Sequence, residues 1–243
     1  MNIIKLDAID STNDFLKELS RNQVVENFSV VTAINQTKGK GQMGSVWQSE
    51  IGKNLTMSIL VKDVLRSITE IYNLNIAVSL GVFQALEELN IPKLSIKWPN
   101  DIMSDTKKIG GILIENGIKT DSRIESVVGI GLNVNQTDFI HLPNASSLAI
   151  VADSEFDLDE VVSKIHFQIK KNCALLVSGQ SEILWGKFHQ VLFKIGVPMP
   201  FEDDQKNRFM GIIQKVSDEG KLEVLLEDDS LKTFGIKEIM MLY

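Results

Sequence analysis

The stretch at residues 95–115 contains the side chains of this chain whose types are best suited to binding or catalysis. Its pattern predicts a strand that breaks at Pro99, a polar turn, and a second strand that begins near Lys108. Two lysines flank an amide and a carboxylate, and the paired glycines that follow allow a ligand or another backbone to approach closely. The residues concerned are Lys97, Asn100, Asp101, Lys108, Gly110 and Gly111. Taken alone, the stretch fits an ordinary hairpin with a solvated turn as well as it fits a binding site.

A glycine-rich segment at residues 36–44 follows a predicted strand at residues 28–34. Its glycines match the G-x-G-x-x-G spacing of dinucleotide-binding loops, but that fingerprint must open a helix. Residues 45–62 predict two strands instead, which argues against dinucleotide binding. The Walker pattern fails as well, because no Lys-Ser or Lys-Thr pair follows the last glycine. Two interpretations remain: a mobile hairpin loop, or a functional loop whose Lys38 and Lys40 contact phosphates.

A helix-capping pattern begins at Ser11, where an acid, Asp14, follows three residues later and an apolar helical face comes next. The segment is either a cap alone, which is the simpler interpretation, or a cap that also offers its polar groups to a small ligand at a helix N-terminus. In the second case Ser11, Thr12 and Asn13 supply the donors and acceptors.

A predicted strand at residues 123–134 carries two glycines at alternate positions, Gly129 and Gly131. Glycines in this arrangement let a flat group approach the backbone closely. Asn133 follows them and either offers a hydrogen-bonding edge to a ligand or starts the next turn.

Composition limits the class of protein. The chain has 243 residues, of which 44% are hydrophobic and 23% charged, with a net charge of −7. These values predict a globular protein and argue against nucleic-acid binding, which depends on neutralising phosphates. A single cysteine, Cys173, excludes an internal disulfide and suits a reducing cytoplasm. No signal peptide, membrane span or zinc-ligand spacing is evident, so no metal ligands are assigned.

The order of predicted elements indicates an α+β fold in two parts. Helices are predicted over residues 74–89, 157–176 and 181–193, with residues 137–156 as a loop. From about residue 195 the pattern changes to short alternating strands with acidic turns, which predicts a small antiparallel barrel. We therefore expect a first domain at residues 1–194 and a small C-terminal β domain at residues 195–243.

Four motifs in this order resemble the biotin–protein ligases, enzymes that attach biotin to carboxylase carrier domains. They are the Ser-Thr-Asn cap, the GKGQMG loop, the stretch from KWPND to KKIGGILIE, and GIGLNVN. The resemblance covers nearly the whole chain. It implies a class II synthetase-like mixed β-sheet with flanking helices, as in biotin and lipoate ligases, plus a small C-terminal SH3-like β-barrel. It also implies ATP and Mg²⁺ as cofactors, with biotin as substrate and a biotin carboxyl carrier domain, such as that of acetyl-CoA carboxylase, as partner.

The resemblance also assigns roles to individual residues. Lys108 would bridge the biotin carboxylate and the α-phosphate of ATP, with Lys97 as a second positive group and Asp101 orienting or deprotonating the acceptor lysine. The biotin-binding residues would be Ser11, Thr12, Asn13, Gln36, Gly41, Lys108, Gly110 and Gly111. The residues that bind ATP or the adenylate would be Gly39, Lys40, Gly41, Gln42, Met43, Gly44, Trp47, Asn100, Lys108 and Asn133.

One departure from the family pattern lies in the glycine-rich loop. Many of these ligases carry arginines where this chain has Lys40 and Gln42. Lysine keeps the charge but lacks the bidentate fork of arginine, and glutamine is neutral. We therefore expect phosphate contacts to depend more on Lys40, Lys108 and backbone N–H groups.

Three alternatives to a biotin ligase stay open from sequence. A lipoate ligase or octanoyltransferase would share the catalytic architecture, a biotin sensor would have lost ligation, and an inert copy of the fold would serve only as an interaction protein. The chain opens directly on the catalytic motifs, so we expect a ligase without a DNA-binding repressor role. Sheet edges in such a fold also make a homodimer a possibility to test.

Overall fold

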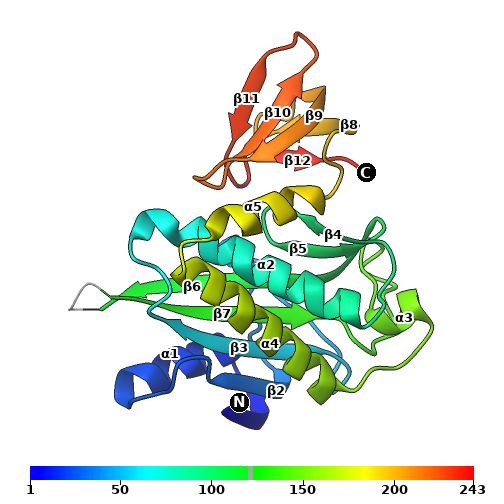
Figure 1. Ribbon diagram of the computed structural model, residues 1–243. Coiled ribbons are helices and arrows are strands. Elements are labelled where there is room, and N and C mark those ends of the chain that lie inside the picture. The colour runs from blue at the N-terminus through cyan, green and yellow to red at the C-terminus, as the bar shows by residue number, and fades with distance from the viewer. Residues whose placement is uncertain (120–122) are drawn as a thin grey trace.

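The computed structural model describes residues 1–119 and 123–243, which form a large mixed sheet flanked by helices and a second, antiparallel sheet (Figure 1). The large sheet has seven strands in the order β1-β2-β3-β7-β6-β5-β4. Only the pairing of β1 with β2 is parallel among the strand pairs described for this sheet. Its strands are β1 (Ile3–Ile9), β2 (Val30–Gln36), β3 (Leu55–Lys62), β4 (Leu94–Lys97), β5 (Asp101–Ser104), β6 (Lys107–Ile118) and β7 (Ile124–Leu132).

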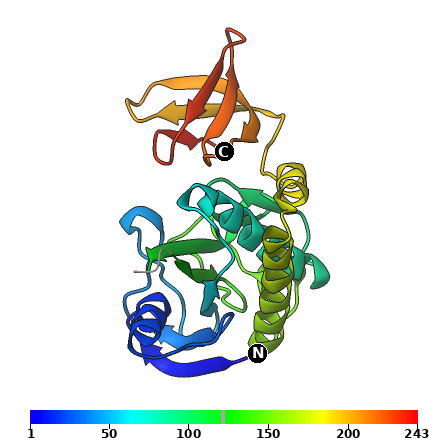
Figure 2. The same ribbon diagram turned by 60° about the vertical axis from the view of Figure 1, so that its left-hand side comes forward.

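Helices cover both faces of this sheet. The period-2 alternation of strand side chains sends Val30, Ile59 and Val128 into the main core, while their neighbours pack with Leu16 of α1 in a separate cluster. Figure 2, turned by 60° from Figure 1, separates α1 from the other long helices across the sheet. The helical segments are α1 (Thr12–Asn22), η1 (Gln42–Gly44), η2 (Ile68–Glu70), α2 (Ile71–Glu88), α3 (Leu148–Ala152), α4 (Leu158–Val177) and α5 (Ser181–Gln190).

Helix α2 is the centre of the main core. The sequence predicts a helix there, and the structure confirms it, with burial around most of its circumference because it lies between the sheet and α4. Gly81 permits this close packing, since a Cβ at that position would lie 2.9 Å from the backbone nitrogen of Ile169 in α4. Helix α4 begins at the predicted cap, where the Asp157 side chain accepts from the backbone N–H groups of Asp159 and Glu160.

The structure corrects three predictions of local structure. Residues 95–115 form three strands rather than two, because β5 begins at Asp101 and turns back at Asp105, which adopts a left-handed φ of 54°. Residues 45–62 contain one strand, β3, preceded by an irregular segment. The loop predicted at residues 137–156 includes the short helix α3. The two missed elements, β5 and α3, are only four and five residues long, so their local pattern is weak. The second strand predicted within residues 45–62, all of which the structure describes, is not formed.

The C-terminal sheet is antiparallel, with strand order β11-β10-β9-β8-β12 and a small apolar core that includes Phe201, Val224 and Phe234. It contacts the turn after β4, where the Trp98 indole N–H donates to the Gly220 carbonyl at 2.9 Å. The domain boundary after residue 194 stays a prediction. The strands are β8 (Pro198–Asp203), β9 (Arg208–Val216), β10 (Leu222–Leu226), β11 (Leu231–Phe234) and β12 (Ile239–Met241).

We find no helix among residues 1–119 and 123–243 with the length and apolarity required to span a bilayer.

Candidate active site

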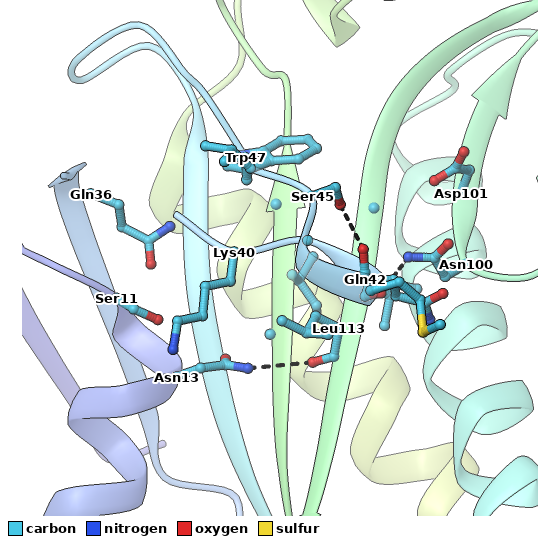
Figure 3. A pocket seen from close by; sticks show the side chains of 18 of the residues that line it. Ser11, Asn13, Gln36, Lys40, Gln42, Ser45, Trp47, Asn100, Asp101 and Leu113 are labelled. Atoms are coloured by element: carbon cyan, nitrogen blue, oxygen red, sulfur yellow. Dashed lines mark hydrogen bonds between the residues drawn. The ribbon is translucent and has the colours of Figure 1, made fainter. Parts of the chain in front are cut away.

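A cavity of about 330 Å³ lies where the start of α1, the glycine-rich loop (residues 39–44), strands β5 to β7 and the C-terminal sheet meet (Figure 3). Most of the residues to which the sequence assigns a role line this one cavity, although they come from segments far apart in the chain. These lining residues are Ser11, Thr12, Asn13, Gln36, Lys40, Gly41, Gln42, Met43, Trp47, Asn100, Asp101, Lys108 and Gly111.

One end of the cavity is a polar network built on the N-terminus of α1. Ser11 is the helix cap, with its side chain accepting from the Asp14 N–H. The Thr12 N–H and hydroxyl both donate to Gln36 Oε1, at 2.8 and 3.0 Å, which leaves the Gln36 amide nitrogen free to face the cavity (Figure 3). The buried Ser58 hydroxyl donates to Asn13 Oδ1 at 2.6 Å. Donors and acceptors are thus held in fixed positions for a small polar ring.

The middle of the cavity holds an ion pair. Lys108 Nζ lies 2.6 Å from Asp101 Oδ1, and the lysine side chain is 37% exposed while the aspartate is 19% exposed. The lysine backbone is fixed, because its N–H donates to the Asn144 carbonyl and its carbonyl accepts from Ser146. A Cβ at Gly111 would lie 3.5 Å from Lys108 Nζ, an ordinary contact distance, so the lysine side chain lies over this part of β6. The ammonium therefore stands at a defined position above the sheet.

Trp47 covers part of the cavity and packs directly on the strand glycines. A Cβ at Gly131 would lie 2.5 Å from Trp47 Cε2, so only glycine lets the indole lie flat against β7. The flat group that the glycines of this strand predict is therefore, in this structure, the indole of Trp47. Lys108 Nζ lies 5.9 Å from the centre of the Trp47 ring. Within the described residues, Trp47 Nε1 is buried without a hydrogen-bond partner, as is Gln42 Oε1.

Lys40 extends toward the start of α1 (Figure 3). Its Nζ lies 2.5 Å from Asp14 Oδ2. Lys17 contacts the same aspartate at 3.1 Å and also Glu115 at 2.6 Å. Partial burial opposes ionisation of Asp14, but the hydrogen bonds and charges of the two lysines outweigh it and hold the pKa of Asp14 below its usual value. In this structure the loop lysine is thus tied to the helix rather than directed at a phosphate position.

Several residues with predicted roles lie outside the cavity wall. Lys97 faces an adjoining cavity, with its Nζ 3.0 Å from Tyr243 Oη and 4.5 Å from the centre of that ring. Asn133 is buried and donates from Nδ2 to the Ser146 carbonyl at 2.9 Å. Gly110 lies behind the wall, where a Cβ would meet the Gly131 carbonyl at 3.0 Å. Gly39 and Gly44 belong to the loop but do not line the cavity.

Sequence reasoning missed residues that support the cavity from a distance. Ser58 lies on β3, and Glu115 accepts from Asn13 Nδ2 at 2.8 Å. Gly129, which the sequence pattern did single out, lies next to Asn13, and a Cβ at this glycine would lie 2.5 Å from Asn13 Oδ1. From the C-terminal sheet, Lys237 reaches the cavity. Glu115 completes the KKIGGILIE motif and offered a signal, whereas Ser58 and Lys237 carry no local signature.

Comparison with known proteins agrees with this geometry. The sequence profile of the biotin/lipoate A/B protein ligase family matches residues 6–135. The bifunctional ligase/repressor BirA of Bacillus subtilis is 34% identical over 170 residues, which cover 67% of this chain and 51% of that protein. The Escherichia coli BirA is 31% identical over 129 residues, covering 53% of this chain and 39% of that protein. The chain thus spans about half the length of these curated relatives, or less.

A solved structure is similar over the full length. The Aquifex aeolicus biotin protein ligase, in complex with biotin and ATP, superposes with a TM-score of 0.81 and 27% identity, covering 99% of this chain and 98% of the other. The match includes the second sheet at the C-terminus, so the fold as a whole is that of the biotin ligases. On the profile match to residues 6–135, the chain belongs to the biotin/lipoate A/B protein ligase family.

Proposed function

We propose that this chain is an ATP-dependent biotin–protein ligase that forms biotinyl-AMP and then transfers biotin to a lysine of a carrier domain. One observation carries the proposal: a single cavity joins the polar network of Thr12 and Gln36 to the ammonium of Lys108. The first end suits a small ring with hydrogen-bonding edges, and the second suits the meeting of two anions. The similarity to the Aquifex protein, whose structure is in complex with biotin and ATP, supports this proposal.

The first step activates the carboxylate. A carboxylate oxygen of biotin attacks the α-phosphorus of ATP, the bond from that phosphorus to the bridging oxygen breaks, and pyrophosphate leaves. Both reactants are anionic, so a fixed cation between them lowers the barrier. Lys108 is the residue for this role, because its backbone is held on both sides and its ammonium faces the cavity.

Lys108 and Asp101 have separate roles in the two steps of the reaction. Asp101 holds the ammonium in position before the substrates bind. When the carboxylate and the α-phosphate take over the Lys108 contacts, Asp101 becomes available to the acceptor. In the second step the neutral amine of a carrier lysine attacks the acyl carbon. The bond between this carbon and the oxygen that bridges to phosphorus breaks, and AMP leaves. We assign the orientation of that amine and acceptance of its proton to Asp101.

Mg²⁺ would enter the site bound to the triphosphate of ATP. Within the described part of the chain, no group of three or more histidine, cysteine, aspartate or glutamate side chains is arranged to hold a metal. Proteins commonly bind Mg²⁺ through substrate phosphates and one or two carboxylates, and Asp101 is a carboxylate on the wall of this cavity. The ion would neutralise the departing pyrophosphate. We assign to Lys97, which lines the adjoining cavity, the second positive charge at that end.

The adenylate must be shielded from water, because an acyl phosphate hydrolyses. Trp47 and the glycine-rich loop form the cover, with the loop residues Gly41, Gln42 and Met43 on the cavity wall. We propose that Lys40 leaves Asp14 for the α-phosphate when the adenylate forms. A Lys40→Ala enzyme that retained biotinyl-AMP as long as the wild type would rule this out.

The proposal extends to the setting of the enzyme. We take the partner to be a biotin carboxyl carrier domain of acetyl-CoA carboxylase or a similar enzyme, in the cytoplasm.

Asn133 and Asn100 are assigned to the adenine end, with Asn100 already fixed by donating to the Ile112 carbonyl at 2.7 Å. The division after residue 194 rests on the end of α5 at Gln190 and the start of β8 at Pro198. A homodimer is left to measurement of the mass in solution.

Mass spectrometry of the purified protein with ATP and Mg²⁺ tests the proposal. Biotin, lipoate and octanoate are supplied separately, each with and without a biotin carrier domain. Biotinyl-AMP without the carrier, and a biotinylated carrier lysine with it, are the expected products. Adenylate formed from lipoate alone would instead identify a lipoate ligase. Bound biotin without any adenylate would identify a sensor, and Gln42→Arg would then be the first variant to examine.

A further inference from the structure

The glycine-rich loop is folded on itself, and Trp47 at its base packs on β7. Its backbone forms a small hairpin, in which the Gly41 N–H donates to the Ser45 carbonyl at 2.8 Å and the Trp47 N–H donates to the Gly39 carbonyl at 2.9 Å. These bonds fix the shape of the loop, but they do not fix its position over the cavity. The ion pair between Lys40 and Asp14 ties one side of the hairpin to α1.

The tip of the hairpin is tied to the C-terminal sheet. Lys237 Nζ donates to the Met43 carbonyl at 3.1 Å, which joins residues 194 positions apart. Both residues adopt left-handed backbone conformations, with φ of 70° at Lys237 and 52° at Met43. Such conformations are costly for residues other than glycine and persist where surrounding structure enforces them, often at functional sites.

The backbone at Lys237 is held in position by a turn. It lies in the β11–β12 connection, where Glu238 accepts from the Gly235 N–H at 2.6 Å and closes a turn. In Figure 1 this connection lies on the side of the C-terminal sheet that faces the large sheet. The C-terminal sheet is docked by the hydrogen bond from Trp98 to the Gly220 carbonyl. Trp98 lies three residues before Asp101, the first residue of β5. The ammonium of Lys237 is therefore positioned relative to the catalytic ion pair.

We propose that Lys237 is a positioning residue that holds the glycine-rich loop over the cavity. In this role, which rests on the proposed ligase function, it couples the C-terminal sheet to retention of the adenylate. Ile236 and Lys237 line both the substrate cavity and the adjoining cavity of about 520 Å³ between the two sheets. The lysine lines both spaces and contacts the loop at Met43, whereas Asp14 contacts it at Lys40. It acts through the loop and does not need to touch the reacting atoms.

Limited trypsin cleavage of the full-length protein, without ligands, tests the attachment directly. Cleavage after Lys40 is followed by mass spectrometry, relative to cleavage after the exposed Lys206 in the same molecule. Lys237→Met should speed the Lys40 cleavage about five-fold, the factor expected for the loss of one hydrogen bond. Lys237→Arg, which keeps a donor of similar reach, should restore the slow rate.

The matched control is Lys232→Met. Lys232 is exposed on the same sheet, 4.9 Å from the centre of the Phe234 ring, and does not line the cavity. It should leave the cleavage rate unchanged. Equal rates for wild type and Lys237→Met would overturn the proposal. An equal acceleration in Lys232→Met would also overturn it, because the effect would then reflect general loosening of the sheet.

A second measurement links the attachment to the reaction. Lys237→Met should lose preformed biotinyl-AMP about five-fold faster than wild type, with the rate of adenylate formation at saturating ATP little changed. A loss of formation rate with unchanged retention would contradict the role. If the wild type forms no adenylate, the proposed function fails, whereas the cleavage rates still decide whether Lys237 holds the loop.

Discussion

Lys108 and Asp101 form a 2.6 Å ion pair across neighbouring strands of the large sheet, at the centre of the cavity. The register of β5 and β6 shifts between Ile102 and Met103, and this irregularity places Lys108 opposite Met103. Because bulged strands re-aim side chains, the shift explains how a lysine and an aspartate that are not directly paired come to meet. In the proposed mechanism, the pair keeps a cation in the cavity while the anionic substrates are absent.

Removal of Lys108 should abolish most of the activity. Lys108→Ala is expected to lower the rate of biotinyl-AMP formation by about 10²- to 10³-fold, the usual effect of losing one fixed charge-stabilising group. Pre-steady-state formation of the adenylate is the measurement. Lys107→Ala is the control, because the adjacent lysine is exposed and donates to the Pro143 carbonyl, away from the cavity. Equal rates for the two variants would exclude the role of Lys108.

Gly131 should be essential for the position of Trp47. Gly131→Ala places a Cβ 2.5 Å from the indole, so the ring must move off β7. We expect a shifted tryptophan emission spectrum and a fall in kcat/KM for ATP of about 10- to 100-fold, since small misplacements in an active site are costly. Gly117→Ala on β6 is the control, because its nearest neighbour, the Glu125 carbonyl, lies 3.7 Å away. An unchanged spectrum in Gly131→Ala would show that the indole does not depend on this glycine.

Ser58 should contribute to stability as well as to binding. Its side chain is fully buried and donates to Asn13 Oδ1, so Ser58→Ala leaves that oxygen without its donor. The expected loss in the free energy of unfolding is about 1–3 kcal/mol, measured by urea denaturation, together with weaker binding of biotin. Ser163→Ala, at an exposed helical position, should change stability by no more than about 0.5 kcal/mol. Full stability in Ser58→Ala would mean that another group satisfies Asn13.

The pKa of Asp14 should show whether Lys40 of the glycine-rich loop contacts this carboxylate. In the folded protein this pKa lies below its usual value despite partial burial, because Lys40 and Lys17 stabilise the carboxylate. Lys40→Met removes one of the two cations, so the pKa should rise while remaining under the influence of Lys17. Carbon NMR of the side-chain carboxyl during an acid titration measures it.

The sign of the stability effect follows from the same shift. A carboxyl group with a lowered folded pKa adds stability above its unfolded pKa, and this stability is lost as pH falls through the folded value. Lys40→Met should therefore lose less stability than wild type on acidification. An Asp14 pKa that is identical in the two proteins would show that the Lys40 contact is absent in solution.

The sequence predicted the features that depend on local pattern. The caps at Ser11 and Asp157 follow from short-range hydrogen bonding, and the helices from apolar periodicity. Strand β5 was missed because four residues between two turns carry little signal. The close contact of Trp47 with Gly131 joins residues far apart in the chain, and the reach of Lys237 to Met43 depends on how the second sheet docks. Such relationships are properties of the folded chain, which no local pattern encodes.

Oxygen labelling of biotin shows whether its carboxylate is activated through biotinyl-AMP. The protein is incubated with ATP, Mg²⁺, a biotin carrier domain and biotin that carries ¹⁸O in its carboxylate. If a carboxylate oxygen attacks the α-phosphorus and the acyl carbon–oxygen bond later breaks, one labelled oxygen remains in the phosphate of AMP. With both carboxylate oxygens labelled, labelled AMP should form in equal amount to biotinylated carrier lysine. Unlabelled AMP, or label in inorganic phosphate instead, would contradict activation through biotinyl-AMP.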